Sequence, residues 1–290
     1  MNISVLIISF KSGHLLEKLI SSIPVNYEVL IIENSLNRDV KKLEKIFTNT
    51  RVIVPENNLG YSKATNLGLK EIKNSLVWLM TPDIDFSRNT IVNFEKLLKN
   101  FRDFALIAPT YIDAQVYKNY HIKKKIVKKE FQIGNYSLSE VDDIDWCLCL
   151  INKKKFGEKK LLDENYFLYF ETMDFALQIR KKKEKIYIVN NLKFNHRGTS
   201  SSDKKYKKEI TINRNWHFCW SKFYYYKKNF SYIYAIRKIM PNLLRSLKNI
   251  VVAKIFNKNE IFELSKAEFL GSINSIFLKK SNYRPKIKLD

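Results

Sequence analysis

Short hydrophobic runs alternate with helix-like segments through the first third of the chain. The runs are rich in Val, Ile and Leu, show no regular apolar–polar alternation, and fall at residues 4–10, 27–35, 50–56 and 75–86. Segments with apolar residues at helical spacing lie between them, at 15–20, 40–47 and 63–72. Continuous apolar strands joined by helices are typical of a parallel sheet covered on both faces. The pattern predicts an α/β fold, in which ligands bind beyond the carboxyl ends of the strands.

The rest of the chain predicts a hairpin, further buried strands and a helical end. A turn at Gly134–Asn135 joins two strand-like pieces, and an apolar strand is expected at 144–152. A strand pair is expected to close on His196. From about Trp216 the sequence is helical, aromatic and basic, with a break predicted at Pro241. We therefore expect a mainly parallel sheet flanked by helices at 1–212 and a helical C-terminal region at 213–290.

The charge of the chain is strongly positive and unevenly distributed. The 290 residues include 52 Lys and Arg against 29 Asp and Glu, a formal net charge of +23. Residues 206–290 alone hold 18 basic and 5 acidic side chains. Such a surplus favours an anionic partner, which is a nucleic acid, lipid head groups or a phosphorylated substrate. A general lysine-rich bias of composition explains the same surplus.

The cysteines and the N-terminus point to an intracellular protein. The three cysteines, at 147, 149 and 219, have the spacing of neither a disulfide framework nor a zinc site. The N-terminal run is interrupted by Lys11 and lacks a basic leader, so it is expected to be a buried strand instead of a signal peptide. No apolar run approaches 18 residues, so no membrane span is expected. The expected location is the cytoplasm.

Polar side chains gather where the predicted strands end, and these are the candidates for ligand binding: Ser9, Lys11, Glu33, Asn34, Asp83 and Asp85. Asp83 and Asp85 directly follow a buried strand and offer the hard oxygen ligands that Mg²⁺ or Mn²⁺ prefers. Alternatively, one of these two acids caps the helix that begins near Ser87.

The segment 57–70 reads NNLGYSKATNLGLK and contains neither a GxGxxG nor a GxxxxGK[ST] motif. Its polar loop, with Asn58 and Gly60, leads into a helix that carries Asn66. This arrangement suits close approach of the backbone to a ligand, and ordinary turn residues explain it as well.

The segment 165–183 reads NYFLYFETMDFALQIRKKK and places Glu171 and Asp174 three residues apart behind an aromatic run. On a helix this spacing puts both acids on one face, where one carboxylate acts as a general base and the other orients it or the acceptor. Acids at the start of a helix also complement its dipole without any catalytic role. His196 ends a predicted strand, and it either completes a metal site or is structural.

The order of these segments resembles glycosyltransferase family 2, the inverting GT-A enzymes, and in particular its rhamnosyltransferase-like and galactofuranosyltransferase-like members. The resemblance covers about residues 3–205. It rests on strands ending SFKS and IIENS, the loop NNLGYSKATNLGL, the element TPDID, the stretch LLDENYFLYFETMDFALQIRKK and finally FNHRGTSS.

The resemblance implies a role for each matching residue. Nucleotide and substrate binding falls on the two strand ends, on the loop and on an aromatic near the acceptor: Ser9, Phe10, Lys11, Glu33, Asn34, Asn58, Gly60, Asn66 and Trp146. The implied ligands of the metal, Mn²⁺ or Mg²⁺, are Asp83 and His196. Asp85 is a further implied ligand, which compensates for the residue replaced by Thr81. The base is expected at Glu171, with Asp174 as the following acid. The chain departs from the family pattern at Glu33 (usually Asp), Thr81 (usually Asn or Asp) and Thr172 (usually the second acid of the pair).

By this resemblance the chain moves a sugar from a nucleotide-diphosphate donor to a hydroxyl of a glycan or lipid-linked acceptor, with inversion. The basic C-terminal helices are then expected to rest on an anionic membrane, to pack within the chain or to form a homodimer contact. Two other functions remain open. One is a degenerate transferase that binds sugar nucleotides without turnover, suggested by Thr81 and Thr172. The other is a nucleic-acid-binding protein, which is not expected because it leaves the acids at the strand ends unexplained.

Overall fold

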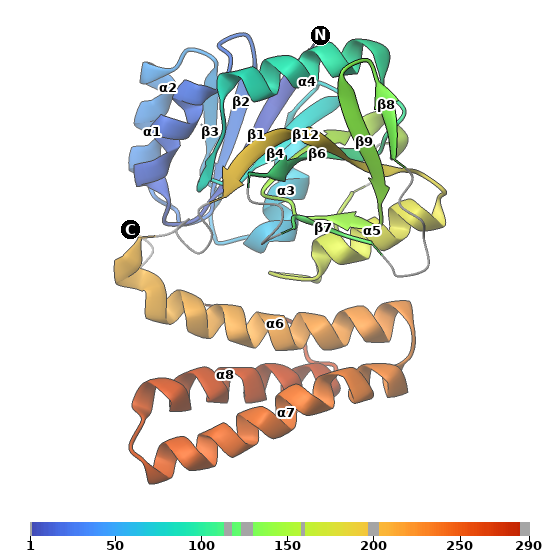
Figure 1. Cartoon of the computed structure of the whole chain (residues 1–290). Coiled ribbons are helices and arrows are strands. Elements are labelled where there is room, and N and C mark those ends of the chain that lie inside the picture. Colours follow the sequence, from blue (N-terminus) through green and yellow to red (C-terminus); the bar gives the residue numbers. More distant parts are fainter. Residues whose placement is uncertain (1, 113–117, 123–129, 158–159, 197–202, 285–290) are drawn as a thin grey trace.

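The computed structural model describes residues 2–112, 118–122, 130–157, 160–196 and 203–284. It contains a ten-stranded sheet with helices on both faces and a separate layer of helices from the C-terminal part of the chain (Figure 1). The strand order is β3-β2-β1-β4-β11-β6-β12-β9-β8, and β5 pairs with β12 outside this path. The sheet class expected from the sequence is confirmed.

The first four strands form the parallel half of the sheet: β1 (Ile3–Ser9), β2 (Glu28–Glu33), β3 (Thr50–Ile53) and β4 (Leu76–Met80). Their side chains are almost fully buried in β1 and β4, as the lack of alternation predicts. The helices between them are α1 (Gly13–Ser22), α2 (Leu43–Ile46), preceded by a short 3₁₀ turn, and α3 (Gly60–Glu71). Because these strands are parallel, their polar carboxyl ends meet at one edge of the sheet.

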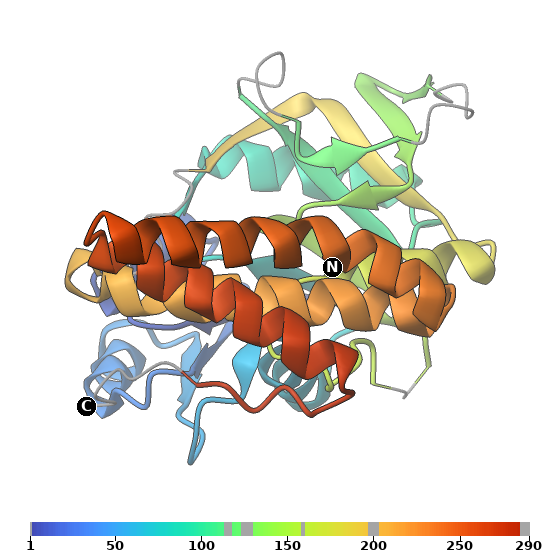
Figure 2. The ribbon, with the colours of Figure 1, turned by 90° about the horizontal axis from the view of Figure 1, so that it is seen from below.

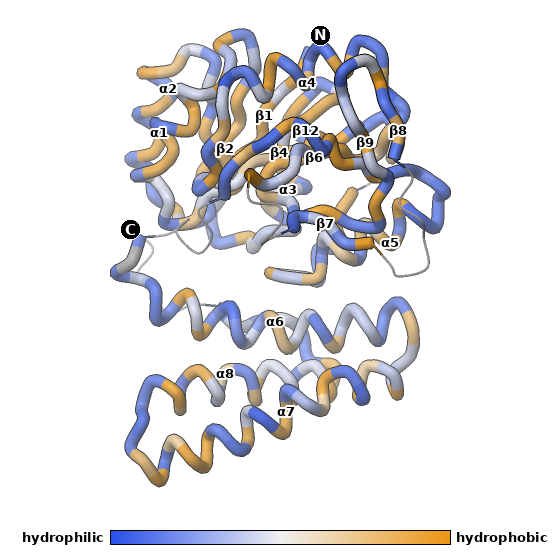
Figure 3. The backbone as a smooth tube through the Cα atoms, viewed as in Figure 1, coloured by the Kyte–Doolittle hydropathy of each residue, from blue (hydrophilic) through white to orange (hydrophobic). Residues whose placement is uncertain are grey.

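Two hydrophobic cores fill the two faces of the sheet. On one face Leu16 of α1 and Phe94 of α4 (Arg88–Asn100) pack on the strands. On the other face Ala64 of α3 and Phe175 of α5 (Glu171–Lys181) do the same. Figure 3 shows the strands between these helices as predominantly hydrophobic. Packing on both faces therefore fixes the sheet, and it holds the groups at the carboxyl ends of the strands in place.

The second half of the sheet is mixed in direction. Its strands are β5 (Ile84–Asp85), β6 (Leu106–Tyr111), β8 (Glu130–Ile133), β9 (Tyr136–Val141), β11 (Leu148–Asn152) and β12 (Ile186–His196). Two short strands, β7 (Tyr120–His121) and β10 (Asp143–Ile144), pair separately. The hairpin at Gly134–Asn135 is confirmed by the β8–β9 pairing.

One detail of the second half differs from the expectation. The expected strand pair before His196 is a single strand, β12, whose register against β6 shifts between Val189 and Lys193. The strand pairs with β9 along its first part, with β6 on both sides of the irregularity, and with β5 at its end.

The C-terminal part forms three packed helices: α6 (Lys207–Asn229), α7 (Tyr232–Ile255) and α8 (Asn259–Ile276). Figures 1 and 2 show α6 nearest to the sheet domain, with α7 and α8 on its outer side. The predicted break at Pro241 is wrong, because Pro241 lies inside α7. Proline removes one hydrogen bond from a helix interior, and here Ala235 and Ile239 before it and Ser246 after it are buried, so tertiary packing keeps the helix continuous. In the described ranges no helix combines the length and apolar character needed to cross a bilayer.

Charged groups join α6 to the sheet domain. The ammonium of Lys228 lies 2.6 Å from Asp174 of α5 and 2.7 Å from Asp163. The amide of Asn229 donates to the second oxygen of Asp174 at 2.6 Å. Asp174 is 3% exposed. The expected boundary between 212 and 213 lies inside α6, so this helix belongs physically to both parts.

Replacing Asp174 by Asn is predicted to lower the free energy of unfolding by about 2 kcal/mol, because a buried charge-assisted contact is lost. A double-mutant cycle with Lys228→Met, followed by chemical denaturation, isolates the coupling between the two side chains. The control is Asp103→Asn at the exposed pair with Lys155, where a change of at most about 0.5 kcal/mol is expected. Additive effects of Asp174→Asn and Lys228→Met would show that α6 is not held by this contact.

Candidate active site

The ends of β1 and β2 are tied together by Glu33. The hydroxyl of Ser9 donates to Glu33 Oε2 at 2.5 Å, and the other carboxylate oxygen accepts from the backbone N–H of Ser35 at 2.8 Å and from the Ser35 hydroxyl. Glu33 is 1% exposed. Three donors thus satisfy this buried carboxylate. The structure thus brings Ser9 and Glu33 together as expected.

A cavity of about 380 Å³ lies beside Glu33 and is also lined by Lys11, Asp203 and Tyr206. Lys11 has a left-handed backbone (φ 54°), and its ammonium lies 4.8 Å from the centre of the Tyr206 ring. Its carbonyl accepts from the N–H of Asp203 at 3.0 Å. Sequence reasoning missed Asp203 and Tyr206, because they are far along the chain and carry no motif.

Asn34 fixes the loop that precedes α3. Its amide donates to the carbonyl of Gly60 at 3.1 Å, and its side-chain oxygen accepts from the N–H of Leu59 at 3.2 Å. The side-chain oxygen of Asn58 accepts from the Gly60 N–H at 3.0 Å. Both asparagines therefore shape the loop itself, and they line the cavity described next.

This central cavity, of about 180 Å³, lies between the carboxyl edge of the sheet and α6. Its lining combines the strand ends, the α3 loop, the aromatic segment and α6: Ile8, Phe10, Ser12, Asn34, Asn58, Gly60, Tyr61, Thr81, Pro82, Phe167, Leu168, Ile210, Asn213 and Arg214. The predicted residues Phe10, Asn34, Asn58 and Gly60 thus meet around one space.

Gly60 makes the closest approach between α3 and the aromatic segment. It has a positive φ of 72°, and a Cβ atom there would lie 2.5 Å from both the ring and the carbonyl oxygen of Phe167. The next N–H, of Tyr61, donates to that carbonyl at 2.7 Å. Only glycine fits such a contact.

Asn66 also binds the segment before the aromatic run. Its side chain exchanges two hydrogen bonds with the backbone of Leu162, at 2.8 and 3.0 Å, and donates to Glu164 at 3.2 Å. Gly60 and Asn66 therefore position residues 162–167, a function that the sequence pattern did not indicate.

Glu171 is the first residue of α5 and is buried in the protein. Two consecutive aromatic residues before it, Tyr169 and Phe170, have left-handed backbones (φ 71° and 66°). Such conformations are strained for bulky residues and are often found at functional sites. Glu171 is 6% exposed, and no described group hydrogen-bonds its Oε2. Burial raises its pKa to about 7, although its own backbone N–H partly offsets this.

Asp174 lies on the same helix but in a different environment. Both of its oxygens are engaged by α6, through Lys228 and Asn229. The two acids therefore have different environments. Glu171 has one carboxylate oxygen without a hydrogen bond, whereas both oxygens of Asp174 bind side chains of α6.

Asp83 and His196 come together at the end of β4. His196 Nε2 lies 3.3 Å from Asp83 Oδ2, and His196 Nδ1 lies 3.3 Å from the Tyr111 hydroxyl, which is 3.4 Å from Asp145. Asp83 is 3% exposed, and its Oδ1 has no hydrogen-bond partner among the described groups. Burial raises the pKa of Asp83, but the hydrogen bond and charge of His196 and a hydrogen bond from Thr81 outweigh it, so the pKa lies below its usual value.

Asp85 is not part of this pair. It forms an exposed ion pair with Lys18 at 3.2 Å, and the cap of α4 is Ser87, whose hydroxyl accepts from the N–H of Asn89. The helix is therefore capped by Ser87 and not by Asp85, whose backbone pairs with that of Asn195, the neighbour of His196. Within the described ranges no group of three or more His, Cys, Asp or Glu side chains has the arrangement of a metal site. The loop RGTSS after His196 lies outside the described residues.

Trp146 is 5% exposed and packs edge-on against Phe175, with ring centres 5.5 Å apart. Its carbonyl accepts from the Tyr61 hydroxyl at 3.4 Å. Its side chain therefore belongs to the core beneath the aromatic segment and supports Tyr61, which lines the central cavity.

Two residues of α6, Asn213 and Arg214, were missed by sequence reasoning. Both line the central cavity, and Arg214 is the only cation among its lining residues. Asn213 is 7% exposed, and its side-chain oxygen has no partner among the described groups. The only signal in the sequence is that polar residues interrupt an aromatic helix at this point.

Comparisons with known proteins agree with this arrangement. The mannosyltransferase PcManGT from Pyrobaculum calidifontis, solved with GDP-Man and Mn²⁺, has a TM-score of 0.56 at 10% identity, over 96% of this chain and 88% of that one. TarS 1–349 from S. aureus has a TM-score of 0.55 at 13% identity, over 98% and 94%. These likenesses show that the fold is GT-A.

A curated relative is the low-salt glycan biosynthesis hexosyltransferase Agl10 of Haloferax volcanii, 19% identical over 198 residues. The match spans 62% of this chain and 62% of the relative, which is less than two thirds of that protein's length. Residues 4–159 match the family described as Glycosyl transferase family 2. This match spans more than half of the chain, and the chain therefore belongs to glycosyl transferase family 2.

Proposed function

We propose that the protein transfers a sugar, a hexose or deoxyhexose, from a nucleotide-diphosphate donor to a hydroxyl of a glycan or lipid-linked acceptor, with inversion. The observation that carries the proposal is Glu171, a buried carboxyl with a pKa of about 7 and one unpartnered oxygen. Its charge acts on Tyr61, which lines the central cavity. A base with such a pKa is half deprotonated at neutral pH, where it combines availability with proton affinity. Fold neighbours solved with GDP-Man and with UDP-GlcNAc support a nucleotide-sugar donor.

In this proposal the donor occupies the carboxyl edge of the sheet. Its base and ribose lie in the cavity beside Lys11 and Glu33, and its sugar lies in the central cavity. Arg214 and the amide of Asn213 face the sugar and the adjoining phosphate from α6. The unpartnered oxygen of Asn213 suits a sugar hydroxyl, because a buried acceptor without a donor is costly.

The chemical step is a direct displacement. Glu171 takes the proton of the acceptor hydroxyl, whose oxygen attacks the anomeric carbon while the bond to the nucleotide diphosphate breaks. The aromatic segment before Glu171 excludes water from the attacking group. Asp174 acts as a positioning residue, since its contacts with Lys228 and Asn229 hold the first turns of α5.

A divalent cation, Mn²⁺ or Mg²⁺, fits the end of β4. The unpartnered Oδ1 of Asp83 is a hard anionic ligand, and His196 adds an imidazole 3.3 Å from its other oxygen. Asp83 and His196 would hold such an ion together with the diphosphate of the donor. When bound, the ion neutralises charge on the leaving diphosphate. Tyr111 orients His196 from behind.

Glu171→Gln is predicted to lower kcat by at least about 100-fold, because the group that accepts the proton is removed. Donor affinity should stay unchanged. In the wild type, kcat/KM should fall about tenfold per pH unit below pH 7, where Glu171 becomes protonated. Steady-state kinetics on a panel of nucleotide sugars and acceptors measure both effects.

The control for this experiment is Glu184→Gln, a glutamate beyond the end of the same helix, which should keep full activity and the same pH profile. Equal inactivity of the wild type and Glu171→Gln on every donor and acceptor would instead favour a sugar-nucleotide-binding protein without turnover. That alternative is suggested by Thr172, which stands where the family usually has an acid.

Asp83→Asn is predicted to weaken Mn²⁺-dependent binding of the nucleotide diphosphate about 10- to 100-fold, because the anionic ligand of the cation is lost. Asp85→Asn is the matched control. It should change the Mn²⁺-dependent affinity for the nucleotide diphosphate by less than about threefold, because Asp85 pairs with Lys18. Calorimetric titration with and without Mn²⁺ gives both values. Equal effects of the two substitutions would contradict the assignment of the metal to Asp83.

The outer helices also support a position at a membrane surface. Exposed apolar side chains recur on α7 at intervals of three or four residues, at Leu244, Leu247, Val251 and Ile255. Lys248 and Lys254 are exposed on the same helix. An apolar face with cationic side chains matches the interface of an anionic bilayer. We propose that this face rests on the inner face of the cell membrane, with a homodimer contact through the same face as the alternative.

Leu247→Asp with Val251→Asp is predicted to reduce binding to anionic phosphatidylglycerol vesicles by at least about tenfold, because charge replaces buried apolar area and repels the lipid. The control is Val25→Asp with Ile46→Asp, two exposed apolar residues of the sheet domain. Vesicle co-sedimentation gives the partition, and sedimentation velocity reports association between copies. Unchanged vesicle binding together with loss of a dimer would assign this face to a second copy.

A further inference from the structure

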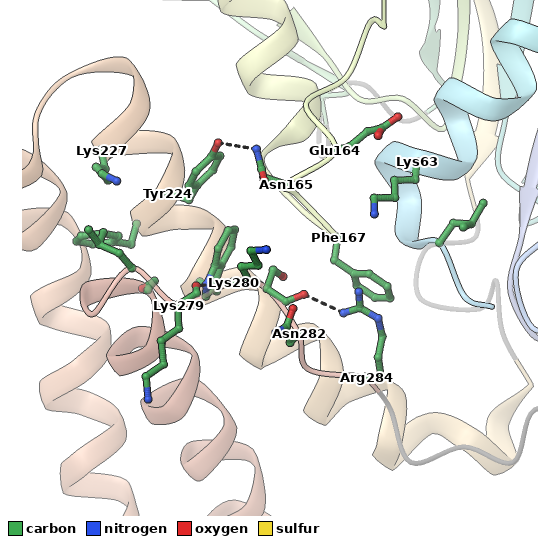
Figure 4. A pocket seen from close by; sticks show the side chains of 16 residues that line it. Lys63, Glu164, Asn165, Phe167, Tyr224, Lys227, Lys279, Lys280, Asn282 and Arg284 are labelled. Carbon is green, nitrogen blue, oxygen red and sulfur yellow. Dashed lines mark hydrogen bonds between the residues drawn. The ribbon is translucent and has the colours of Figure 1, made fainter.

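A second, basic cavity lies where α3, α6 and the chain after α8 meet, and the proposed reaction does not use it. Its volume is about 240 Å³ (Figure 4). Its lining is Leu59, Lys63, Glu164, Asn165, Phe167, Trp220, Phe223, Tyr224, Lys227, Ser275, Leu278, Lys279, Lys280, Ser281, Asn282 and Arg284. This size is just below that of common small-molecule sites, so it suits a compact polar group.

The charge of the cavity is strongly positive. The cations come from three separate parts of the chain: Lys63 from α3, Lys227 from α6, and Lys279, Lys280 and Arg284 from the segment after α8. In the described ranges none of the five forms an ion pair with a carboxylate. The only acid of the lining, Glu164, binds Lys160 at 2.8 Å and Asn66 at 3.2 Å, and its charge is also felt by Lys63 without a direct contact. Gathering like charges around one hollow costs free energy unless an anion occupies it.

Arg284 is held in place at the floor of this cavity. Its guanidinium lies 3.9 Å from the centre of the Phe167 ring, and it donates to the carbonyls of Ser281 at 3.0 Å and Tyr283 at 2.6 Å. Stacking and two hydrogen bonds leave other N–H groups of the planar guanidinium for a ligand. Figure 4 shows Lys63, Lys280 and Arg284 around Phe167, with Lys227 and Lys279 farther out.

The segment that carries three of the cations is fixed to α6. Trp220 donates to the carbonyl of Lys279 at 2.8 Å, and the ring of His217 contacts the Ser281 hydroxyl and the Tyr283 carbonyl, each at 3.0 Å. Burial lowers the pKa of His217 to about 3, so its ring is neutral and acts as a structural support. The cationic groups are therefore presented by an ordered backbone.

Phe167 is shared between the two cavities. Its ring supports Arg284 in the basic cavity, while the same residue lines the central cavity and contacts Gly60. A ligand in the basic cavity would thus be separated by Phe167 from the central cavity, where the sugar is expected.

We propose that the basic cavity binds a phosphate or diphosphate group that is distinct from the diphosphate of the donor. Arginine and lysine are the side chains that recognise such groups, through charge-assisted hydrogen bonds. The group belongs either to a soluble phosphorylated ligand or to a lipid head group, since α7 offers a membrane face on the same helical layer. This binding does not depend on sugar transfer and therefore does not rest on the proposed function.

The test is calorimetric titration of the full chain with inorganic pyrophosphate in the absence of divalent metal. Lys63→Ala with Lys280→Ala is expected to weaken binding at least about tenfold, because two charge-assisted contacts are lost. The control is Lys96→Ala with Lys99→Ala, two exposed lysines of α4 on the opposite face of the sheet. Equal affinity of the two double variants, or no binding to the wild type, would overturn the proposal. Thermal melts establish that both variants are folded.

Two further measurements identify the source of the phosphate and separate this site from the donor site. Vesicles of phosphatidylcholine with phosphatidic acid distinguish the sources: weaker vesicle binding of Lys63→Ala with Lys280→Ala indicates a lipid head group, and unchanged vesicle binding with lost pyrophosphate binding indicates a soluble ligand. Binding of nucleotide diphosphate with Mn²⁺ should be the same in this variant as in the wild type. Its loss would mean that the cavity is part of the donor site. Glu171→Gln should keep pyrophosphate binding, so a failure of the proposed chemistry leaves this test intact.

Discussion

The close approach of Gly60 to Phe167 is the contact on which the site depends. With no Cβ at Gly60, the start of α3 lies directly against the aromatic segment, and the N–H of Tyr61 binds the Phe167 carbonyl. From the other side the Ser221 hydroxyl of α6 donates to the carbonyl of Leu168 at 2.8 Å. Held between two helices, the chain passes through two left-handed residues and begins α5 with Glu171 buried. The burial that raises the pKa of Glu171 is thus a consequence of backbone packing.

The helix α6 has two functions in this arrangement. It carries Asn213 and Arg214 to the central cavity, and it holds α5 through Lys228 and Asn229. Separating α6 from the sheet domain would therefore remove both the lining of the central cavity and the contacts that hold α5. The C-terminal region therefore has structural functions besides its positive charge. It closes the central cavity, lines the basic cavity and presents the exposed apolar side chains of α7.

The sequence predicted those features that follow from local pattern. Continuous apolar runs gave the strands, and the parallel order placed Ser9, Glu33 and Asp83 at one edge of the sheet, because parallel strands share their carboxyl ends.

The features that sequence reasoning missed depend on distant contacts. Asp85 is paired by Lys18, 67 residues away, and Asn66 binds a backbone 96 residues away. Neither partner is encoded near the residue. Pro241 shows the same limit, since the packing of α7 against its neighbours outweighs a local preference.

The most direct test of the account is the titration of Glu171 itself. In protein labelled with ¹³C at glutamate side-chain carboxyls, the resonance that disappears in Glu171→Gln identifies the group, and its chemical shift can be followed with pH. The account predicts a midpoint near 7, because the carboxyl is buried without a compensating charge. A midpoint near the ordinary value for glutamate, about 4.3, would show that Glu171 is solvated, and would contradict its assignment as the base.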